Sequence, residues 1–100
     1  MANICRNELH AYSSHPENIQ HIRKYIRVNM DLSQLQYFTP EVIEVCFDSK
    51  WSFPIAEMEE MFDSLPYKDD IRIEVLSIEW GNLYTAFNSC DENGWREIRN

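Results

Sequence analysis

The order in which two kinds of apolar spacing follow each other constrains the fold of this chain more than any other feature. Residues 15–29 carry isoleucines at helical intervals, and residues 55–65 form a second helical stripe. Segments in which apolar and polar residues alternate, as they do in strands, precede, separate and follow the two stripes. A helical stripe must bury against another element, and a sheet offers a suitable surface. The order therefore predicts an α+β two-layer sandwich, with two helices on one face of an antiparallel or mixed sheet.

Four to five segments have the composition of strands. Residues 33–39 make the difference between four and five, because Pro40 interrupts the run that they begin. The others are residues 3–13, 42–49, 71–80 and a segment that begins at Leu83. The resulting order is strand, helix, one or two strands, helix and two strands. This order favours a ferredoxin-like arrangement.

The closing part of the chain reads as a hairpin followed by a tail. The apolar parity changes between Val75 and Leu76, which predicts a β-bulge near Val75. Gly81 and Asn82 suit a two-residue hairpin loop. That loop pairs three residues on each side, Trp80 with Leu83, Ile78 with Thr85 and Leu76 with Phe87, and gives one mostly apolar face. Residues 89–100 are predicted to form a turn and a short packed tail.

The stretch FDSKWSFP joins a strand to the second helix. Phe47 ends the strand, and Pro54 suits the first turn of the helix, where its missing amide hydrogen is not needed. Between them, Trp51 is predicted to pack against core on both sides, because a buried strand precedes it and a capped helix follows. The alternative is that Trp51 lies at the surface as an interface anchor.

Length and composition indicate one globular domain over residues 1–100. A chain of 100 residues can hold one core without metal or disulfide, and it shows no internal repeat or linker-like stretch. Its three cysteines, Cys5, Cys46 and Cys90, are an odd number at wide spacings, so we expect reduced thiols. The amino terminus lacks a basic region followed by an apolar run, and no window is apolar enough for a membrane span. These features predict a cytoplasmic protein that does not enter a membrane.

The charge of the chain argues against direct binding of nucleic acid. Nine basic and 17 acidic residues give a net charge of −8, which repels phosphate backbones. The acidic residues of the second helix, Glu57, Glu59, Glu60 and Asp63, are read as a solvated face rather than a metal site.

No catalytic, cofactor-binding or metal-binding residues are predicted. Cys5 and His10 point to opposite faces of one strand, so they cannot form a nucleophile and its base there. His10, His15 and His21 have no cysteine or carboxylate beside them at ligand spacing. The chain also has no phosphate-binding glycine loop and no dinucleotide fingerprint, so no cofactor is expected.

Two stretches resemble a known family. The opening residues 2–9, ANICRNEL, are similar to the alanine-asparagine, cysteine, asparagine and leucine start of the YubB-type ferredoxin-like domain of plasmid and phage proteins, and FDSKWSFP resembles its strand-to-helix corner. The family usually has a second proline where this chain has Phe53, and a long insertion after the first helix. The resemblance implies the ferredoxin-like fold and a bacterial, mobile-element origin. It implies no activity.

Aromatic residues provide the candidate interface. Such residues either cap a small core or anchor contacts with a partner, and five of them are candidates: Trp51, Phe53, Trp80, Tyr84 and Trp95. A one-sided helix layer leaves the other sheet face partly apolar, and such a face usually pairs with something. We therefore expect a non-enzymatic protein-interaction module that binds a partner protein or forms a homodimer through the open sheet face.

Two other functions stay open at this point. The first is a small enzyme with a pocket near Trp51 that uses Asp48 or Cys46 from the strand end. The second is an acidic inhibitor that mimics nucleic acid and acts on a host defence enzyme, which the charge of −8 and the mobile-element resemblance motivate.

Overall fold

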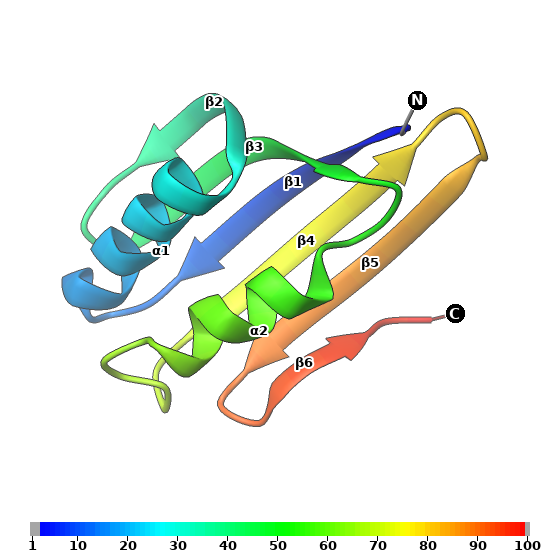
Figure 1. Ribbon diagram of the computed structural model, residues 1–100. Helices are drawn as coiled ribbons and strands as arrows, with labels where there is room; N and C mark the ends of the chain where they lie inside the picture. The colour runs from blue at the N-terminus through cyan, green and yellow to red at the C-terminus, as the bar shows by residue number, and fades with distance from the viewer. Residues whose placement is uncertain (1–2, 100) are drawn as a thin grey trace.

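Strands and helices follow one another in the order that the apolar spacing predicts. The structure is a computed structural model that describes residues 3–99, apart from the side chains of residues 32 and 33 (Figure 1). The elements are β1 (Ile4–Tyr12), α1 (Pro16–Asn29), β2 (Asp31–Phe38), β3 (Val42–Lys50), α2 (Ile55–Asp63), β4 (Arg72–Glu79), β5 (Tyr84–Asp91) and β6 (Gly94–Glu97).

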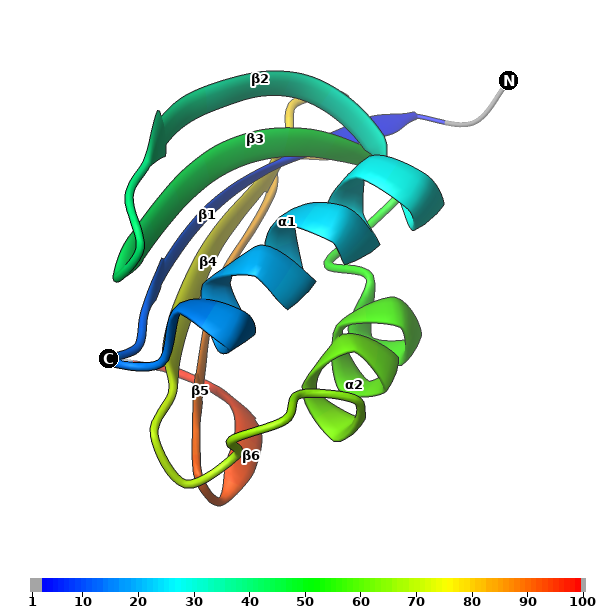
Figure 2. The same ribbon diagram turned by 90° about the vertical axis from the view of Figure 1, so that its left-hand side faces the viewer.

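All described strands belong to one antiparallel sheet with the order β2-β3-β1-β4-β5-β6. Figure 2 shows α1 and α2 on the same side of this curved sheet, while the opposite side carries no helix. The α+β class and the one-sided helix layer are therefore confirmed. We call the side without helices the open face.

The strand count is six, and the expectation of four to five is wrong. The additional strand, β6, lies in the segment that was predicted to be a turn and a packed tail. Gly94 begins β6 with a φ of 97°, a conformation that favours glycine, and pairs with Asp91. A strand of four residues is too short to show a clear alternation, so its pairing with β5 could not be read from the sequence.

The β-bulge predicted near Val75 is absent from β4. The pairing of β4 with both β1 and β5 runs without a shift, and Leu76 is exposed between buried Val75 and Ser77. The apolar parity changes because Leu76 lies on the open face, not because the strand is irregular. The predicted pairs Ile78 with Thr85 and Leu76 with Phe87 are confirmed, although the loop spans the four residues 80–83.

The core fills the space between the helices and the sheet. It combines the isoleucine stripe of α1 and two methionines of α2 with alternate residues of the central strands: Ile19, Ile22, Ile26, Met58, Met61, Leu9, Ala11, Ile43, Val45, Phe47, Ile73 and Val75. Because α1 and α2 bury their apolar sides only against this face, the open face depends on its own side chains for cover.

A buried carboxylate holds the β4–β5 loop. Glu79 is only 2% exposed, and its two carboxylate oxygens accept hydrogen bonds from the backbone N–H groups of Gly81 (2.7 Å) and Asn82 (2.8 Å). A Cβ atom at Gly81 would lie 2.8 Å from Glu79 Oε1, so a larger residue there would displace the carboxylate. The Glu79 carboxylate therefore fixes the backbone of the loop through two hydrogen bonds.

We predict that Glu79→Gln lowers the free energy of unfolding by about 1–3 kcal/mol, because the amide oxygen can accept only one of the two backbone hydrogen bonds, while the NH₂ group faces the other N–H and cannot accept it. Glu74→Gln is the matched control, since it removes the same charge from a half-buried side chain on the same strand. Urea unfolding of both variants measures the difference. Equal losses for the two variants would contradict the role of Glu79.

Candidate functional site

The strand-to-helix corner contains a backbone turn that places Trp51 outside the core. Trp51 has a φ of 72°, and the N–H of Ser52 donates to the carbonyl of Lys50 at 2.8 Å, which closes a three-residue turn around Trp51. Its side chain is 51% exposed, whereas Phe53 is 7% exposed and fills the core beside it. The prediction that Trp51 packs against core on both sides is therefore wrong. The backbone turns at Trp51, so the Trp51 ring lies at the surface and the Phe53 ring is the one buried in the core.

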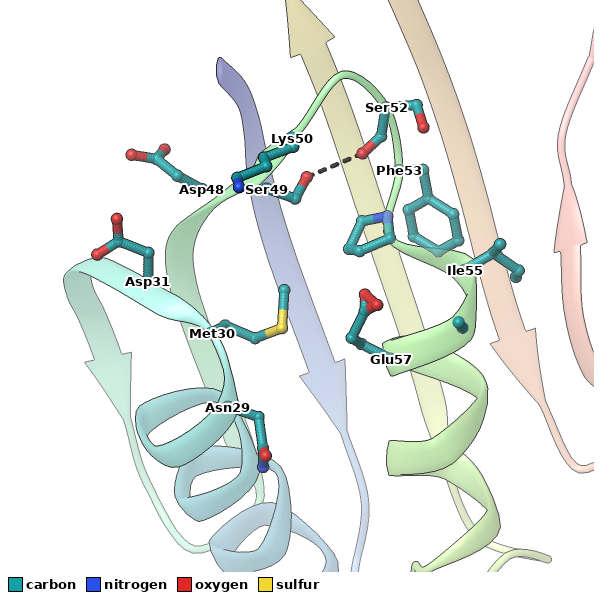
Figure 3. A pocket seen from close by; sticks show the side chains of 12 residues that line it. Asn29, Met30, Asp31, Asp48, Ser49, Lys50, Ser52, Phe53, Ile55 and Glu57 are labelled. Carbon is teal, nitrogen blue, oxygen red and sulfur yellow. Dashed lines mark hydrogen bonds between the residues drawn. The ribbon is translucent and has the colours of Figure 1, made fainter. Parts of the chain in front are cut away.

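A buried polar network anchors this corner to the sheet. Asn7 is fully buried; its Oδ1 accepts from Ser77 Oγ at 2.7 Å, and its Nδ2 donates to Ser49 Oγ at 2.9 Å. Ser49 Oγ in turn donates to the carbonyl of Ser52 at 2.8 Å (Figure 3). The conformation at Trp51 is thus tied through hydrogen bonds to the central strand β1 and its neighbour β4.

A cavity of about 540 Å³ lies beside the corner, between the end of α1 and the start of α2. Figure 3 shows that Glu57 of α2 and Met30, which directly follows α1, point into it. Asp48 is among its lining residues, but Trp51 and Cys46 are not. Cys46 is buried in β3, where it accepts a contact from Arg6 Nη2 at 3.3 Å. We call this cavity the corner pocket.

The five candidate interface aromatics separate into two groups. Phe53, Tyr84 and Trp95 pack together: the rings of Phe53 and Trp95 meet edge to face at 5.3 Å, and the N–H of Phe53 donates to Tyr84 Oη at 3.3 Å. Trp95 is also fixed by its Nε1, which donates to the carbonyl of Met58 at 2.9 Å. Trp51 and Trp80 are exposed, the latter by 74%. Two of the five residues are therefore free to touch a partner through most of their surface.

The open face carries an apolar row that its own strands place side by side. Leu76 pairs with Phe87 across β4 and β5, and Ile98 follows β6 with its N–H bonded to the carbonyl of Phe87. These side chains are between 37% and 39% exposed. Ile78 of β4 is partly exposed, and Trp80, the first residue of the hairpin loop, is exposed.

Two hollows on the open face meet at this row. One, of about 400 Å³, is lined by Leu76, Thr85, Ala86, Phe87, Glu97, Ile98 and Arg99. The other, of about 300 Å³, is lined by Glu8, Leu9, His10, Gln36, Glu44, Glu74, Leu76 and Phe87. Because Leu76 and Phe87 line both hollows, the two lie next to each other across the strands, and together we call them the open-face groove. One end is largely apolar and the other contains three carboxylates.

The acidic end of the groove is built by register. Glu44 and Glu74 are the β3 and β4 partners of His10 in the pairing of β1. His10 therefore lies between two carboxylates, with Nε2 at 3.7 Å from Glu44 and Nδ1 at 4.0 Å from Glu74. Sequence reasoning identified Leu76 and Phe87 through the hairpin, but it missed these carboxylates because their meeting depends on pairings between distant strands.

Comparisons with protein-family models, with curated proteins and with solved structures of other proteins found no match to this chain. The resemblance to the YubB-type family thus stays a hypothesis. In the part of the chain that the structure describes, no helix is long and apolar enough to cross a membrane. Within residues 3–99, no three histidine, cysteine or carboxylate side chains are grouped as metal ligands.

We predict that the Trp51→Gly protein is more stable than the Trp51→Ala protein by about 1 kcal/mol, because only glycine adopts a positive φ without cost. Both variants lack the indole ring, so its lost contacts cancel in the comparison. Lys50 provides the control: it lies in extended strand, where glycine should be less stable than alanine. If urea unfolding shows the alanine variant to be more stable than the glycine variant at position 51 as well as at position 50, the turn at Trp51 is refuted.

Phe53 rather than Trp51 is expected to carry the stability of the corner. Phe53→Ala removes a buried ring and should cost about 3–5 kcal/mol. Trp51→Ala removes a half-exposed ring and should cost no more than about 1.5 kcal/mol. Thermal unfolding of the two variants checks the order, and a larger loss for Trp51→Ala would restore the packing interpretation.

Proposed function

We propose that the protein is a non-enzymatic protein-interaction module whose docking surface is the open face of the sheet. The observation that carries this proposal is the open-face groove, whose floor is the contiguous row of Leu76, Phe87 and Ile98. Single exposed apolar residues are common on soluble proteins, but a contiguous row with a polar rim is typical of a contact surface. Trp80, exposed in the adjoining hairpin loop, is the kind of side chain that anchors interfaces.

The core supports this assignment because it is complete without the open face. In the described part of the chain, every buried side-chain nitrogen and oxygen atom has a hydrogen-bond partner. The helices cover one face only. The fold therefore does not depend on any cover over the groove. Its apolar floor remains accessible, and we assign it to contact with another molecule.

The corner pocket offers less support for an enzyme. Active sites commonly gather groups with perturbed pKa values around a cavity. Burial raises the pKa of the Cys5 and Tyr25 side chains and that of Cys90, the last to about 12, and it lowers the pKa of His21. These four side chains do not line the corner pocket. The small-enzyme alternative rests on Asp48 alone, since Cys46 lies elsewhere.

The ferredoxin-like classification belongs to the same proposal. The elements β1 to β4 with α1 and α2, and the strand order β2-β3-β1-β4, support it, with β5 and β6 as an extension of one edge. The bacterial, mobile-element origin and the cytoplasmic location inferred from the sequence accompany this classification as hypotheses.

A second candidate function is the acidic inhibitor that mimics nucleic acid. Among the described residues, Glu57, Glu59 and Asp63 of α2 form no ion pair, so their charges remain available on the helix side. Such an inhibitor would compete with DNA for a DNA-binding enzyme, and it would act through α2 rather than the open face. Neutralising α2 carboxylates therefore separates it from the interaction module.

We predict that a photo-crosslinking amino acid at position 87 captures a discrete product in the cells that produce the protein. Val28, which is 67% exposed on α1, provides the control position and should give no such product. Adding Ile98→Asp to the position-87 protein should abolish the product, because a charge then enters the groove floor. Equal labelling from positions 87 and 28, or no product from either, would overturn the proposed function.

A further inference from the structure

We infer that the occupant of the open-face groove is a cationic amphipathic helix of another protein. The inference rests on the proposed function, because it names the partner of the same surface. It follows from three properties of the groove: its backbone groups, its charge and its length.

The backbone of the groove excludes an extended strand as occupant. Strands β1, β3 and β4 pair with a neighbour on both sides, and β5 does so over residues 88–91, so these backbone N–H and C=O groups are used within the sheet. An extended segment lying on this face would have to bury its own backbone without partners, which is costly. A helix satisfies its backbone internally and presents only side chains. The face of this sheet therefore suits a helix, whereas strand addition belongs to sheet edges.

The charge of the groove selects a positive partner and disfavours a second copy. Its acidic end holds Glu8, Glu44 and Glu74. Arg6 lies 3.7 Å from Glu8 and Arg72 lies 3.8 Å from Glu74, so the three carboxylates outnumber the two arginines beside them. The chain as a whole has a net charge of −8, so two copies repel each other over any approach of their open faces. A helix with lysine or arginine above the carboxylates gains attraction and speed of association instead.

The length of the groove fixes the length of the helix. Its lining residues come from all six strands, from Gln36 of β2 to Glu97 of β6, and from Ile98 and Arg99 beyond β6. Six neighbouring strands at about 4.8 Å spacing span about 24 Å. At a rise of about 1.5 Å per residue this corresponds to a helix of about 16 residues. Its apolar stripe would contact Leu76, Phe87 and Ile98, and its basic end would lie over β1 and β3.

The test uses a synthetic peptide of about 16 residues, with leucines at i, i+3, i+4 and i+7 and lysines near one end. Titration calorimetry with the full chain should show one-to-one binding that weakens as salt is added. Two control peptides are a version with glutamate in place of each lysine and a version of the same composition in which the leucines form no stripe. Both should bind at least about tenfold more weakly, a difference that corresponds to about 1.4 kcal/mol.

Variants of the chain then locate the bound peptide. Glu44→Gln with Glu74→Gln removes two charges from the acidic end, and Ile98→Ser removes part of the apolar floor; each should weaken binding about tenfold. Glu59→Gln with Asp63→Asn removes the same charge from α2 and should change the affinity by less than about twofold. Thermal melting of each variant shows that the fold is kept. Equal effects of the two charge-removing pairs would show attraction without a site and overturn the inference.

The remaining outcomes separate this inference from the proposed function. If the control peptide whose leucines form no stripe binds as tightly as the striped peptide, the inference that the occupant is an amphipathic helix is overturned. A position-87 crosslink to a second copy of this chain, or to a partner segment without a basic amphipathic helix, overturns the partner assigned here and leaves the docking surface intact. A crosslink to a basic amphipathic helix of another protein, together with binding of the striped peptide, supports both the docking surface and the partner assigned to it.

Discussion

The strict alternation of the central strand β1 is the constraint on which the rest of the molecule depends. Its nine residues are exposed and buried in turn, and it pairs with β3 along its whole length and with β4 from Arg6 to Tyr12. Once Leu9 and Ala11 face the helices, the register fixes which residues of the neighbouring strands do the same. Glu8 and His10 are thereby placed on the open face, beside Glu44, Glu74 and Leu76. A slip of one residue would exchange the core for the groove.

The same parity connects the core to the corner. Asn7 lies on the buried side of β1, in a position where a leucine or valine would be expected. Its amide instead binds Ser77 and Ser49, and through Ser49 it reaches the turn at Trp51. A buried amide that is fully hydrogen-bonded rigidifies its surroundings, whereas one that loses a partner is costly. The corner is thus held by a polar contact from the middle of the sheet rather than by packing of Trp51.

Local patterns in the sequence predict the helices and strands well, but they predict poorly which residues of distant elements come into contact. The isoleucine stripe of α1 and the hairpin around Gly81 depend on neighbouring residues, so spacing alone reveals them. Strand β6 escapes prediction because four residues carry no period, and Leu76 was mistaken for a sign of a bulge because one sequence cannot tell an open face from an irregular strand. The groove's carboxylates come together only through the pairing of β1 with β3 and β4. The exposure of Trp51 depends on a single φ angle, which composition does not specify.

The edges of the sheet give a further reason to look for the partner on its face. Strand β6 offers only four residues, among them Arg96 and Glu97, and charged short edges resist pairing with another strand. Strand β2 is longer, but its pairing with β3 shifts register twice, between Leu32 and Gln34 and between Leu35 and Tyr37. Such irregular edges twist away from a regular template. Apart from residues 84–86 of β5, which β6 does not reach, the edges are protected in this way, and the floor of the groove offers a partner side chains rather than backbone groups. A helix forms its backbone hydrogen bonds internally. It can therefore bind this face through side chains alone and needs no backbone hydrogen bonds from the sheet.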